Sequence, residues 1–259
     1  MTDKQPTRPG SKAADREDRR FDQTYLGKGH AEGVHRDYAA HFFRWGFVSR
    51  FVDNTDTVID IGCGPELPLA KILFQSGGWP LAERMLGIDL NKIKAPNWGR
   101  LTVYDETDIT DPDSADRVRG YFAEHEIEGA NVVSCFEVVE HMAPDDALRL
   151  VEQAYALLVP GGSLLLSTPI FHKHRARNHI HEFGIDELRG LIESAGFTVE
   201  KRYGTFMNAN AAKKAATPEE KKTLMALSKY YSWDVLSTFL APLYPDESRN
   251  NLWVCRKPE

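Results

Sequence analysis

The chain has 259 residues, 42% of them hydrophobic and 27% charged, which is the balance of a globular protein long enough to bury a large core. Its net charge of −6 argues against a broadly basic nucleic-acid-binding protein, although a local basic patch remains compatible with it. The three cysteines, Cys63, Cys135 and Cys255, are widely spaced and lie in or beside apolar runs. We therefore expect reduced, packed thiols, and neither a metal centre nor a disulfide framework.

The N-terminal part of the chain combines a polar tail with an aromatic segment. Residues 1–22 are polar, contain prolines and carry both signs of charge, so we expect them to be disordered. No signal peptide or apolar run of membrane length is visible, which favours a cytoplasmic protein without a membrane partner. Apolar residues between Gly27 and Asp53 recur at helical spacing, which predicts an amphipathic helix packed against a sheet. The polar side chains of this region that could line a cleft are Tyr25, His30, His35, Arg36 and His41.

A buried strand, a tight turn and a helix are predicted at residues 57–73, which read TVIDIGCGPELPLAKIL. Gly62 and Gly64 can adopt backbone angles closed to other residues, and they leave room for a ligand beside the main chain. Asp60 lies near the carboxyl end of the strand, where open α/β sheets bind ligands. A carboxylate there would repel a pyrophosphate, and Leu67 replaces the third glycine of the dinucleotide fingerprint. A nicotinamide-dependent oxidoreductase is therefore disfavoured.

Polar residues also follow the next predicted strands. Residues 85–90 form an apolar run that ends at Asp89, and a carboxylate at this edge can accept hydrogen bonds from both hydroxyls of a ribose. A third strand is predicted at the start of residues 101–111, LTVYDETDITD, and an acidic loop follows it. A fourth strand is predicted within residues 131–142, NVVSCFEVVEHM, with polar side chains after it.

The D-x-G-x-G pattern at Asp60, Gly62 and Gly64, with Asp89 after the second strand, resembles motifs I and II of the class I S-adenosylmethionine-dependent methyltransferases. Glu66 stands where that family usually has a third glycine. The resemblance implies an α/β fold with a Rossmann-like, seven-stranded mixed sheet. It also implies an enzyme that moves a methyl group from S-adenosyl-L-methionine to an O, N or C acceptor. The residues that it assigns to the cofactor are Asp60, Gly62, Gly64, Asp89, Asp108, Ile109 and Phe136.

Residues 131–142 resemble motif IV of the same family, which forms the wall beside the reactive methyl group. The segment 157–169, LLVPGGSLLLSTP, is close to the hairpin that follows this motif. The resemblance therefore places Phe136 and Glu137 beside the methyl group. It makes His141 the best candidate for a general base or a substrate-orienting group, with Glu137 as the second candidate for catalysis.

The residues around Glu137 also fit a divalent metal. On a helical turn Glu137, Glu140 and His141 would share one side, and His179 and His181 follow the fifth strand. Two carboxylates and two imidazoles suit a divalent cation such as Mg²⁺ or Mn²⁺. The E-x-x-E-H and N-H-x-H-x-F patterns resemble the small-RNA 3′-terminal 2′-O-methyltransferases, which implies Glu137, Glu140, His141 and His181 as metal ligands. The alternative is a metal-free site in which the same residues orient the substrate or act as base.

The C-terminal half of the chain predicts two more helices and three more strands. A helix from Pro144 is expected to stop at residues 160–162, where a fifth strand begins. A helix at 184–195 and a strand at 197–203 follow, and the last strand is expected at 252–255. The predicted buried face of the first helix is Leu148, Val151, Tyr155 and Leu158.

A long insertion separates the last two predicted strands. It contains a helix start at Thr217 and five aromatic residues, so it is either a substrate-specificity cap or a surface helical pair that buries its own aromatics. The expected organisation is a tail at 1–22, a core at 23–205, the insertion at 206–250 and a last strand with the C-terminus at 251–259. The aromatic residues are Tyr230, Tyr231, Trp233, Phe239 and Tyr244.

The acceptor is expected to be a small molecule or a nucleic-acid component, with no obligatory protein partner. A basic cluster after the fifth strand could meet a phosphate or a carboxylate of the substrate, or could be a solvated loop. A catalytically silent module that binds the cofactor and regulates a partner is the non-enzyme alternative. The cluster consists of His172, His174, Arg175 and Arg177.

Overall fold

The computed structural model describes residues 36–75, 80–173 and 175–259. The predictions for the tail at 1–22, and for Tyr25, His30 and His35, lie outside these residues. The strands are β1 (Thr57–Ile61), β2 (Arg84–Ile88), β3 (Leu101–Tyr104), β4 (Ala130–Phe136), β5 (Leu158–Pro169), β6 (Thr198–Phe206) and β7 (Asn250–Arg256). The α-helices are α3 (Arg36–Val48), α4 (Pro68–Gln75), α5 (Pro112–Glu124), α6 (Pro144–Leu157), α7 (Ile185–Ser194), α8 (Ala209–Ala215), α9 (Pro218–Leu227) and α10 (Trp233–Leu240). Three 3₁₀ turns are η2 (Val139–His141), η3 (Ala241–Leu243) and η4 (Pro245–Glu247).

All seven strands form one sheet in the order β3-β2-β1-β4-β5-β7-β6. Strands β1 to β5 pair in parallel, while β7 runs antiparallel to both β5 and β6. This confirms the predicted Rossmann-like mixed sheet. The carboxyl ends of the five parallel strands lie at one edge, and the start of β7 lies at that same edge because β7 is antiparallel to β5.

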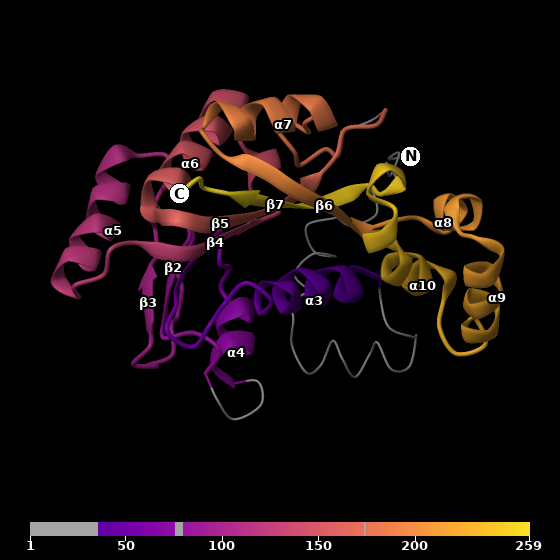
Figure 1. Ribbon diagram of the computed structural model, residues 1–259, viewed down its shortest axis with the longest axis horizontal. Coiled ribbons are helices and arrows are strands. Elements are labelled where there is room, and N and C mark those ends of the chain that lie inside the picture. The colour runs from indigo at the N-terminus through magenta and orange to yellow at the C-terminus, as the bar shows by residue number, and fades with distance from the viewer. Residues whose placement is uncertain (1–35, 76–79, 174) are drawn as a thin grey trace, which may run out of the picture.

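Helices cover both faces of the sheet (Figure 1). Helices α5, α6 and α7 lie on one face and α3 and α4 on the other. Alternate side chains of β1 show how the strand serves both layers: Ile59 and Ile61 pack with the first group, and Val58 packs with α3 and α4 on the opposite side. A parallel strand between two helical layers is buried throughout, which is why β1 reads as an apolar run.

One strand boundary and one buried helix face differ from the sequence prediction. Strand β5 begins at Leu158, before the predicted stop, because Gly161 takes a φ of 72° and the pairing register with β4 shifts there. Of the predicted buried face of α6, only Val151 is among the buried residues of the helix. Tyr155 is partly buried against the core, and Leu158 is buried but is the first residue of β5. The buried residues of α6 are Ala147, Leu150, Val151, Ala154 and Leu157.

Residues 207–249, which we call the insertion segment, connect β6 to β7 and contain α8, α9, α10, η3 and η4. The segment has a small core of its own and lies at one end of the sheet, beside β6 (Figure 1). Gly204 allows the close approach, because a side chain there would clash with Ser248 and with the carbonyl of Ala241. The core residues are Met207, Ala212, Ala216, Leu224, Leu236, Leu240 and Ala241.

Within the described part of the chain, no helix combines the length and the apolar character needed to cross a membrane.

Candidate functional site

A cavity of about 480 Å³ lies at the carboxyl ends of the parallel strands. Gly62 follows β1 in its wall, Asp89 follows β2, and Asp108 and Ile109 follow β3. The opposite part of the wall comes from the end of β4 and the turn after it, residues 136–142. The volume is in the range of small-molecule sites, and the position is where open α/β sheets bind ligands.

The glycine turn between β1 and α4 is tied to the end of β2. Gly62 has a φ of 73° and Gly64 a φ of 70°, in the left-handed region that glycine tolerates best. The Gly62 N–H donates to the Ile88 carbonyl at 2.8 Å, and the Gly64 N–H donates to Oδ2 of Asp89 at 2.9 Å. A side chain on Gly62 would clash with Val138 after β4. The turn therefore has to be bare where it faces the cavity.

Leu67 stands where the dinucleotide fingerprint has its third glycine. It has a φ of 49°, a left-handed angle that is costly for a side chain with a Cβ. The side chain is only 2% exposed and packs in the core shared by α3 and α4. The backbone thus keeps a shape suited to glycine, and burial of the leucine side chain offsets the strain.

Asp60 lies below the cavity and is not part of its lining. Its side chain is 4% exposed, and the Ser134 hydroxyl donates to Oδ1 at 2.7 Å. Burial, opposed in part by the Ser134 hydrogen bond, raises the pKa of Asp60 from 3.8 to about 7. The contact of Asp60 with the cofactor therefore stays a prediction.

The two acidic residues after β2 and β3 do line the cavity. Asp89 accepts hydrogen bonds from the Asn91 backbone N–H at 2.8 Å and its side-chain amide at 3.0 Å, both through Oδ1. Oδ1 of Asp108 accepts from the backbone N–H and the hydroxyl of Thr110, at 2.9 and 2.8 Å. Ile109 beside it is buried and gives the wall an apolar patch.

Glu137 follows β4 in a strained backbone conformation with a φ of 59°. Both carboxylate oxygens are held: the Ser167 hydroxyl donates to Oε1 at 3.0 Å, and the Asn250 amide donates to Oε2 at 2.7 Å. Arg44 of α3 lies 3.5 Å from Oε1. Elements from across the chain therefore fix this side chain at the cavity wall.

Arg44 and His41 link α3 to this wall. The Arg44 guanidinium is 3% exposed, and it donates to the Thr205 hydroxyl at 3.3 Å and to Nδ1 of His41 at 2.8 Å. Burial and the adjacent Arg44 charge lower the pKa of His41 to about 3, so this imidazole is neutral. The sequence had suggested His41 as a cleft residue but had not singled out Arg44.

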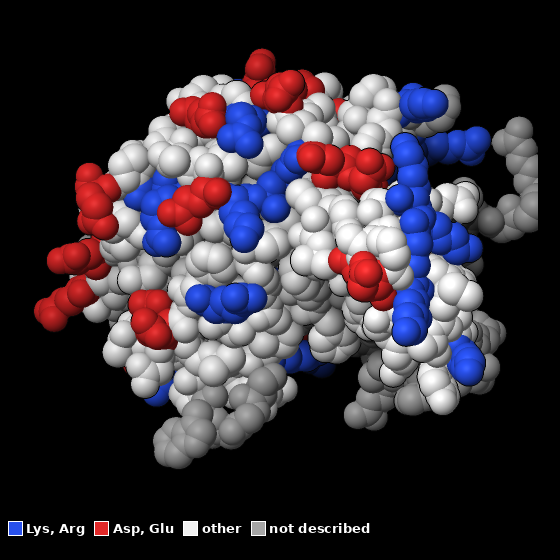
Figure 2. Space-filling view, turned by 45° about the vertical axis from the view of Figure 1, so that its right-hand side comes forward, with Lys and Arg blue, Asp and Glu red and all other residues white. Residues whose placement is uncertain are grey.

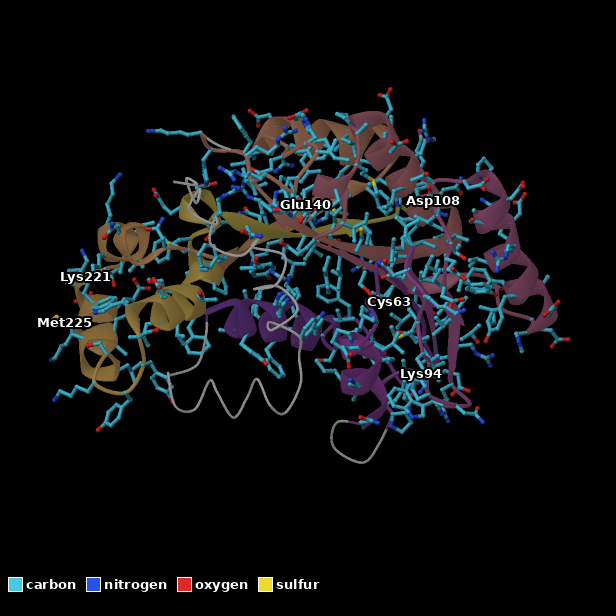
Figure 3. All side chains as sticks on the ribbon, turned by 180° about the vertical axis from the view of Figure 1, so that it is seen from behind. Cys63, Lys94, Asp108, Glu140, Lys221 and Met225 are labelled. Atoms are coloured by element: carbon cyan, nitrogen blue, oxygen red, sulfur yellow. The ribbon has the colours of Figure 1, made fainter. Side chains whose placement is uncertain are left out.

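Glu140, His141 and His179 form a second cluster, in which one potential ligand atom from each residue lies within 4.8 Å of the others. Glu140 is 1% exposed and accepts a hydrogen bond from Thr168 at 3.1 Å. Burial first, and then the charge of Glu137, raise the pKa of Glu140 well above its ordinary value. Figure 3 shows Glu140 near the centre of the molecule, with Asp108 toward one end.

Each imidazole of this cluster is oriented by an oxygen acceptor. Nδ1 of His141 lies 3.1 Å from the Asn178 carbonyl, and Nδ1 of His179 lies 2.7 Å from a carboxylate oxygen of Glu182. An oxygen of this kind can only accept, so Nδ1 carries the hydrogen in both rings and Nε2 is the basic nitrogen.

Glu182 is a residue that the sequence did not suggest. Arg249 donates to both of its carboxylate oxygens at 2.7 Å, and the Ala176 N–H donates at 2.9 Å. Burial alone would raise the pKa of Glu182, but hydrogen bonds from Ala176, Arg249 and His179 outweigh it and hold the pKa below its ordinary value. The carboxylate thus ties the loop after β5 to the start of β7.

The clustered residues differ from the metal ligands implied by resemblance. Among the described residues, the group that could hold a metal includes His179 and does not include Glu137 or His181. Nε2 of His181 instead lies 2.7 Å from Oε1 of Glu187. The reason is local: Glu137 ends a strand in the left-handed region, and a 3₁₀ turn follows it, so the expected helical face is not formed.

Comparison with known proteins agrees with this fold. The model of the family described as "Methyltransferase domain" matches residues 35–202, more than half of the chain, and the chain belongs to this family. Its sheet topology is that of the class I S-adenosylmethionine-dependent methyltransferases, and solved structures of that fold align over most of the chain.

Individual relatives are distant. A "Probable S-adenosylmethionine-dependent methyltransferase" of Mycolicibacterium smegmatis is 30% identical over 60% of this chain and 57% of its own length. A "Small RNA 2'-O-methyltransferase" of Rattus norvegicus is 29% identical over 49% of this chain and 33% of its own length. The chain thus spans little more than half, or less, of these relatives. A structure of Burkholderia thailandensis 1,6-didemethyltoxoflavin-N1-methyltransferase with S-adenosylhomocysteine aligns with a TM-score of 0.54 and 15% identity. The alignment covers 98% of this chain and 93% of that chain, and the similarity concerns the fold alone.

Proposed function

We propose that this methyltransferase acts on an acceptor that gives up a proton, an O–H or N–H group of a small molecule or of a nucleic-acid component. One observation carries the proposal: His141 lines the same cavity as the glycine turn and the acidic residues of β2 and β3. A basic imidazole nitrogen is thereby placed in the cavity that these cofactor residues line. The Asn178 carbonyl orients the ring so that Nε2 is its basic nitrogen, which makes this imidazole a candidate proton acceptor.

In this proposal the cofactor is S-adenosyl-L-methionine, and it lies along the β1, β2 and β3 side of the cavity. Gly62 and Gly64 give close access to the main chain. Asp89 receives one ribose hydroxyl, because a carboxylate offers about four lone-pair sites and protein donors take three of them. Asp108 and Ile109 receive the adenine, one by hydrogen bonding and the other by apolar contact. Asp60 lies below the cofactor, and because its pKa is raised to about 7, its carboxyl group is mostly charged only above that pH.

The acceptor meets the methyl group at Phe136 and Glu137. A bound cofactor would supply a sulfonium methyl group to the acceptor oxygen or nitrogen, and the bonding electron pair would leave with the sulfur. The acceptor proton passes to Nε2 of His141, whose ring the Asn178 carbonyl orients. Alignment of the reactants contributes roughly 7–11 kcal/mol in favourable cases, and a positioned base adds about 10²–10⁴-fold. Glu137, held on both oxygens, positions the wall rather than exchanging protons.

The test uses labelled methyl donor with a panel of metabolites and nucleic acids, followed by mass spectrometry of the product. His141→Asn should lower kcat by about 10²-fold or more while S-adenosylhomocysteine still binds. His181→Asn is the matched control, since that imidazole pairs with Glu187 and should leave the rate nearly unchanged. Full activity in His141→Asn would refute the role of this residue. Cofactor binding by the unaltered protein without any product would favour the silent regulatory module.

A second candidate is divalent-metal-dependent RNA 2′-O-methylation. Two observations favour it. One is the cluster of Glu140, His141 and His179, and the other is the similarity to a small-RNA 2′-O-methyltransferase, which extends over 49% of the chain. One carboxylate and two imidazoles suit a divalent transition metal, with Mn²⁺ a better match than Mg²⁺. The Nδ1 hydrogen bonds of both rings to oxygen acceptors are typical of metal-ligating histidines. A bound metal would supply Lewis-acid polarisation of an acceptor hydroxyl.

Metal binding separates the two candidates. Under the second, Mn²⁺ should raise the melting temperature of the unaltered protein, and His179→Ala should abolish that increase. His181→Ala should retain it, because His181 lies outside the cluster. Indifference of the unaltered protein to Mn²⁺ and Mg²⁺ would leave the metal-free mechanism.

A further inference from the structure

The insertion segment lies outside the residues that the family model matches, yet it is a folded part of the protein. Trp233 and Tyr244 pack against its core, and the hydroxyl of Tyr244 donates to Glu220 at 2.6 Å. Side chains that this core does not use are therefore available for another purpose.

Positive charge and exposed apolar side chains gather on the outer side of α8, α9 and the turn after them. Between Ala209 and Tyr231 the chain has five lysines and two glutamates, a net charge of +3 in a protein whose net charge is −6. One of the glutamates, Glu220, is turned toward Tyr244. Figure 2 shows a band of Lys and Arg side chains over the side of the molecule that carries these helices. The lysines are Lys213, Lys214, Lys221, Lys222 and Lys229.

The aromatic part of this surface is unusually open. Tyr230 is 81% exposed, Tyr231 44% and Met225 65%, and residues 225–231, which contain them, also include Lys229. Tyrosines of a surface helical pair would be expected to pack on their own helices, as Tyr244 does. Figure 3 shows Lys221 and Met225 at the outer end of the molecule, away from the sheet.

A second basic segment lies beside the candidate site. The loop after β5 carries the exposed side chains of Lys173, Arg175 and Arg177 before it reaches His179. Its anchor is Arg249, the last residue of the insertion segment, through Glu182 and through the Ile170 carbonyl at 2.5 Å. Arg249 therefore ties the basic loop after β5 to the end of the insertion segment.

We propose that the insertion segment and the loop after β5 bind a single-stranded nucleic acid and present it to the site. Lysine ammonium groups suit phosphates as point charges, and exposed tyrosine rings suit unstacked bases. The insertion segment contains no arginine apart from Arg249, whose guanidinium is bound to Glu182, so this segment does not offer a free guanidinium for the bidentate contacts that read guanine in a duplex. The inference deepens the proposed function by naming the acceptor class, and rests on it for the reaction but not for binding.

The experiment measures binding without methyl donor, by fluorescence anisotropy of labelled polyuridine of about 20 nucleotides, a length that spans one or more site sizes. Affinity should fall steeply between about 50 and 200 mM salt. Tyr230→Ala with Tyr231→Ala should weaken binding roughly tenfold or more, because stacking is lost. Lys221→Ala with Lys222→Ala should weaken it several-fold and reduce the salt dependence.

The matched control is Lys92→Ala with Lys94→Ala. Both lysines are exposed, and Lys94 lies far from Lys221 and Met225 of the insertion segment (Figure 3), so this double substitution should not affect binding. No binding, equal binding by all variants, or a preference for a duplex of the same length would overturn the proposal. Affinity for phosphatidylserine vesicles instead of polyuridine would assign the surface to membranes and overturn it equally. Methyl transfer to a small metabolite without nucleic-acid binding would refute this inference and leave the proposed function standing. Nucleic-acid binding without any methyl transfer would refute the proposed function and leave this inference standing.

Discussion

Replacement of Asp60 by asparagine should change the dependence of folding stability on pH. Burial raises the pKa of this carboxyl group from 3.8 to about 7, with Ser134 opposing and Asp89 adding to the increase. In the unfolded chain the group returns to its ordinary pKa. Between these two values the folded protein keeps a proton that the unfolded chain has lost, so the free energy of unfolding decreases as pH rises from about 4 to about 7.

The size of the effect follows from the two pKa values. One pH unit corresponds to about 1.4 kcal/mol, so a difference of about three units corresponds to about 4 kcal/mol, fully expressed above pH 7. Asparagine has nearly the same shape and retains the Oδ1 that accepts the Ser134 hydrogen bond at 2.7 Å. The variant should therefore gain stability relative to the unaltered protein by an amount that grows up to about pH 7 and then stays constant.

The assay is urea unfolding of both proteins across this pH range, with the free energy taken from linear extrapolation. The control is Asp116→Asn, an exposed carboxylate paired with Arg119, which should leave the pH dependence unchanged. Glu140 contributes a slope of the same sign in both proteins, because its pKa is also raised, so the comparison isolates Asp60. Parallel curves for Asp60→Asn and the unaltered protein would refute the reasoning.

Three further substitutions test individual positions. Gly62→Ala should weaken S-adenosylhomocysteine binding in a calorimetric titration and cost about 1–2 kcal/mol in stability, because the turn needs a left-handed angle and the new methyl group would clash with Val138; unchanged affinity would contradict it. Gly204→Ala should cost about 1–3 kcal/mol and speed hydrogen exchange in the insertion segment, since the new side chain would clash with Ser248; uniform exchange rates would count against this contact. Leu67→Gly should destabilise the protein by about 2–4 kcal/mol in urea, because the lost burial exceeds the relieved strain; a more stable variant would reverse that ranking.

The sheet and the cofactor side of the site could be predicted because their signals are local. The apolar run of β1 and the glycines after it specify strand and turn through nearest neighbours alone. Asp89 and Asp108 each follow a strand, and parallel strands bring their ends to one edge, so sequence order fixes their neighbourhood. The insertion before β7 was visible for the same reason, as a gap between two strand patterns.

The acceptor side could not be predicted to the same depth, because its contacts join residues far apart in the chain. Arg44 reaches Glu137 from α3, and Asn250 reaches it from β7. The spacing of Glu137 and His141 predicted one helical face, but Glu137 itself has a left-handed backbone and His141 ends a 3₁₀ turn. Only tertiary packing decides that His179 joins the cluster while His181 pairs with Glu187.

The start of β7 connects the insertion segment to the site. Asn250 holds Glu137 at the wall of the cavity, and Arg249 holds Glu182, which in turn orients His179. Arg249 is the last residue of the insertion segment, and Asn250 is the first residue of β7. We therefore expect a ligand that moves this segment to act on two side chains that position the acceptor side. Under our proposals, an insertion at this point in the fold would control the acceptor, which is the arrangement expected when one type of methyl donor serves many different substrates.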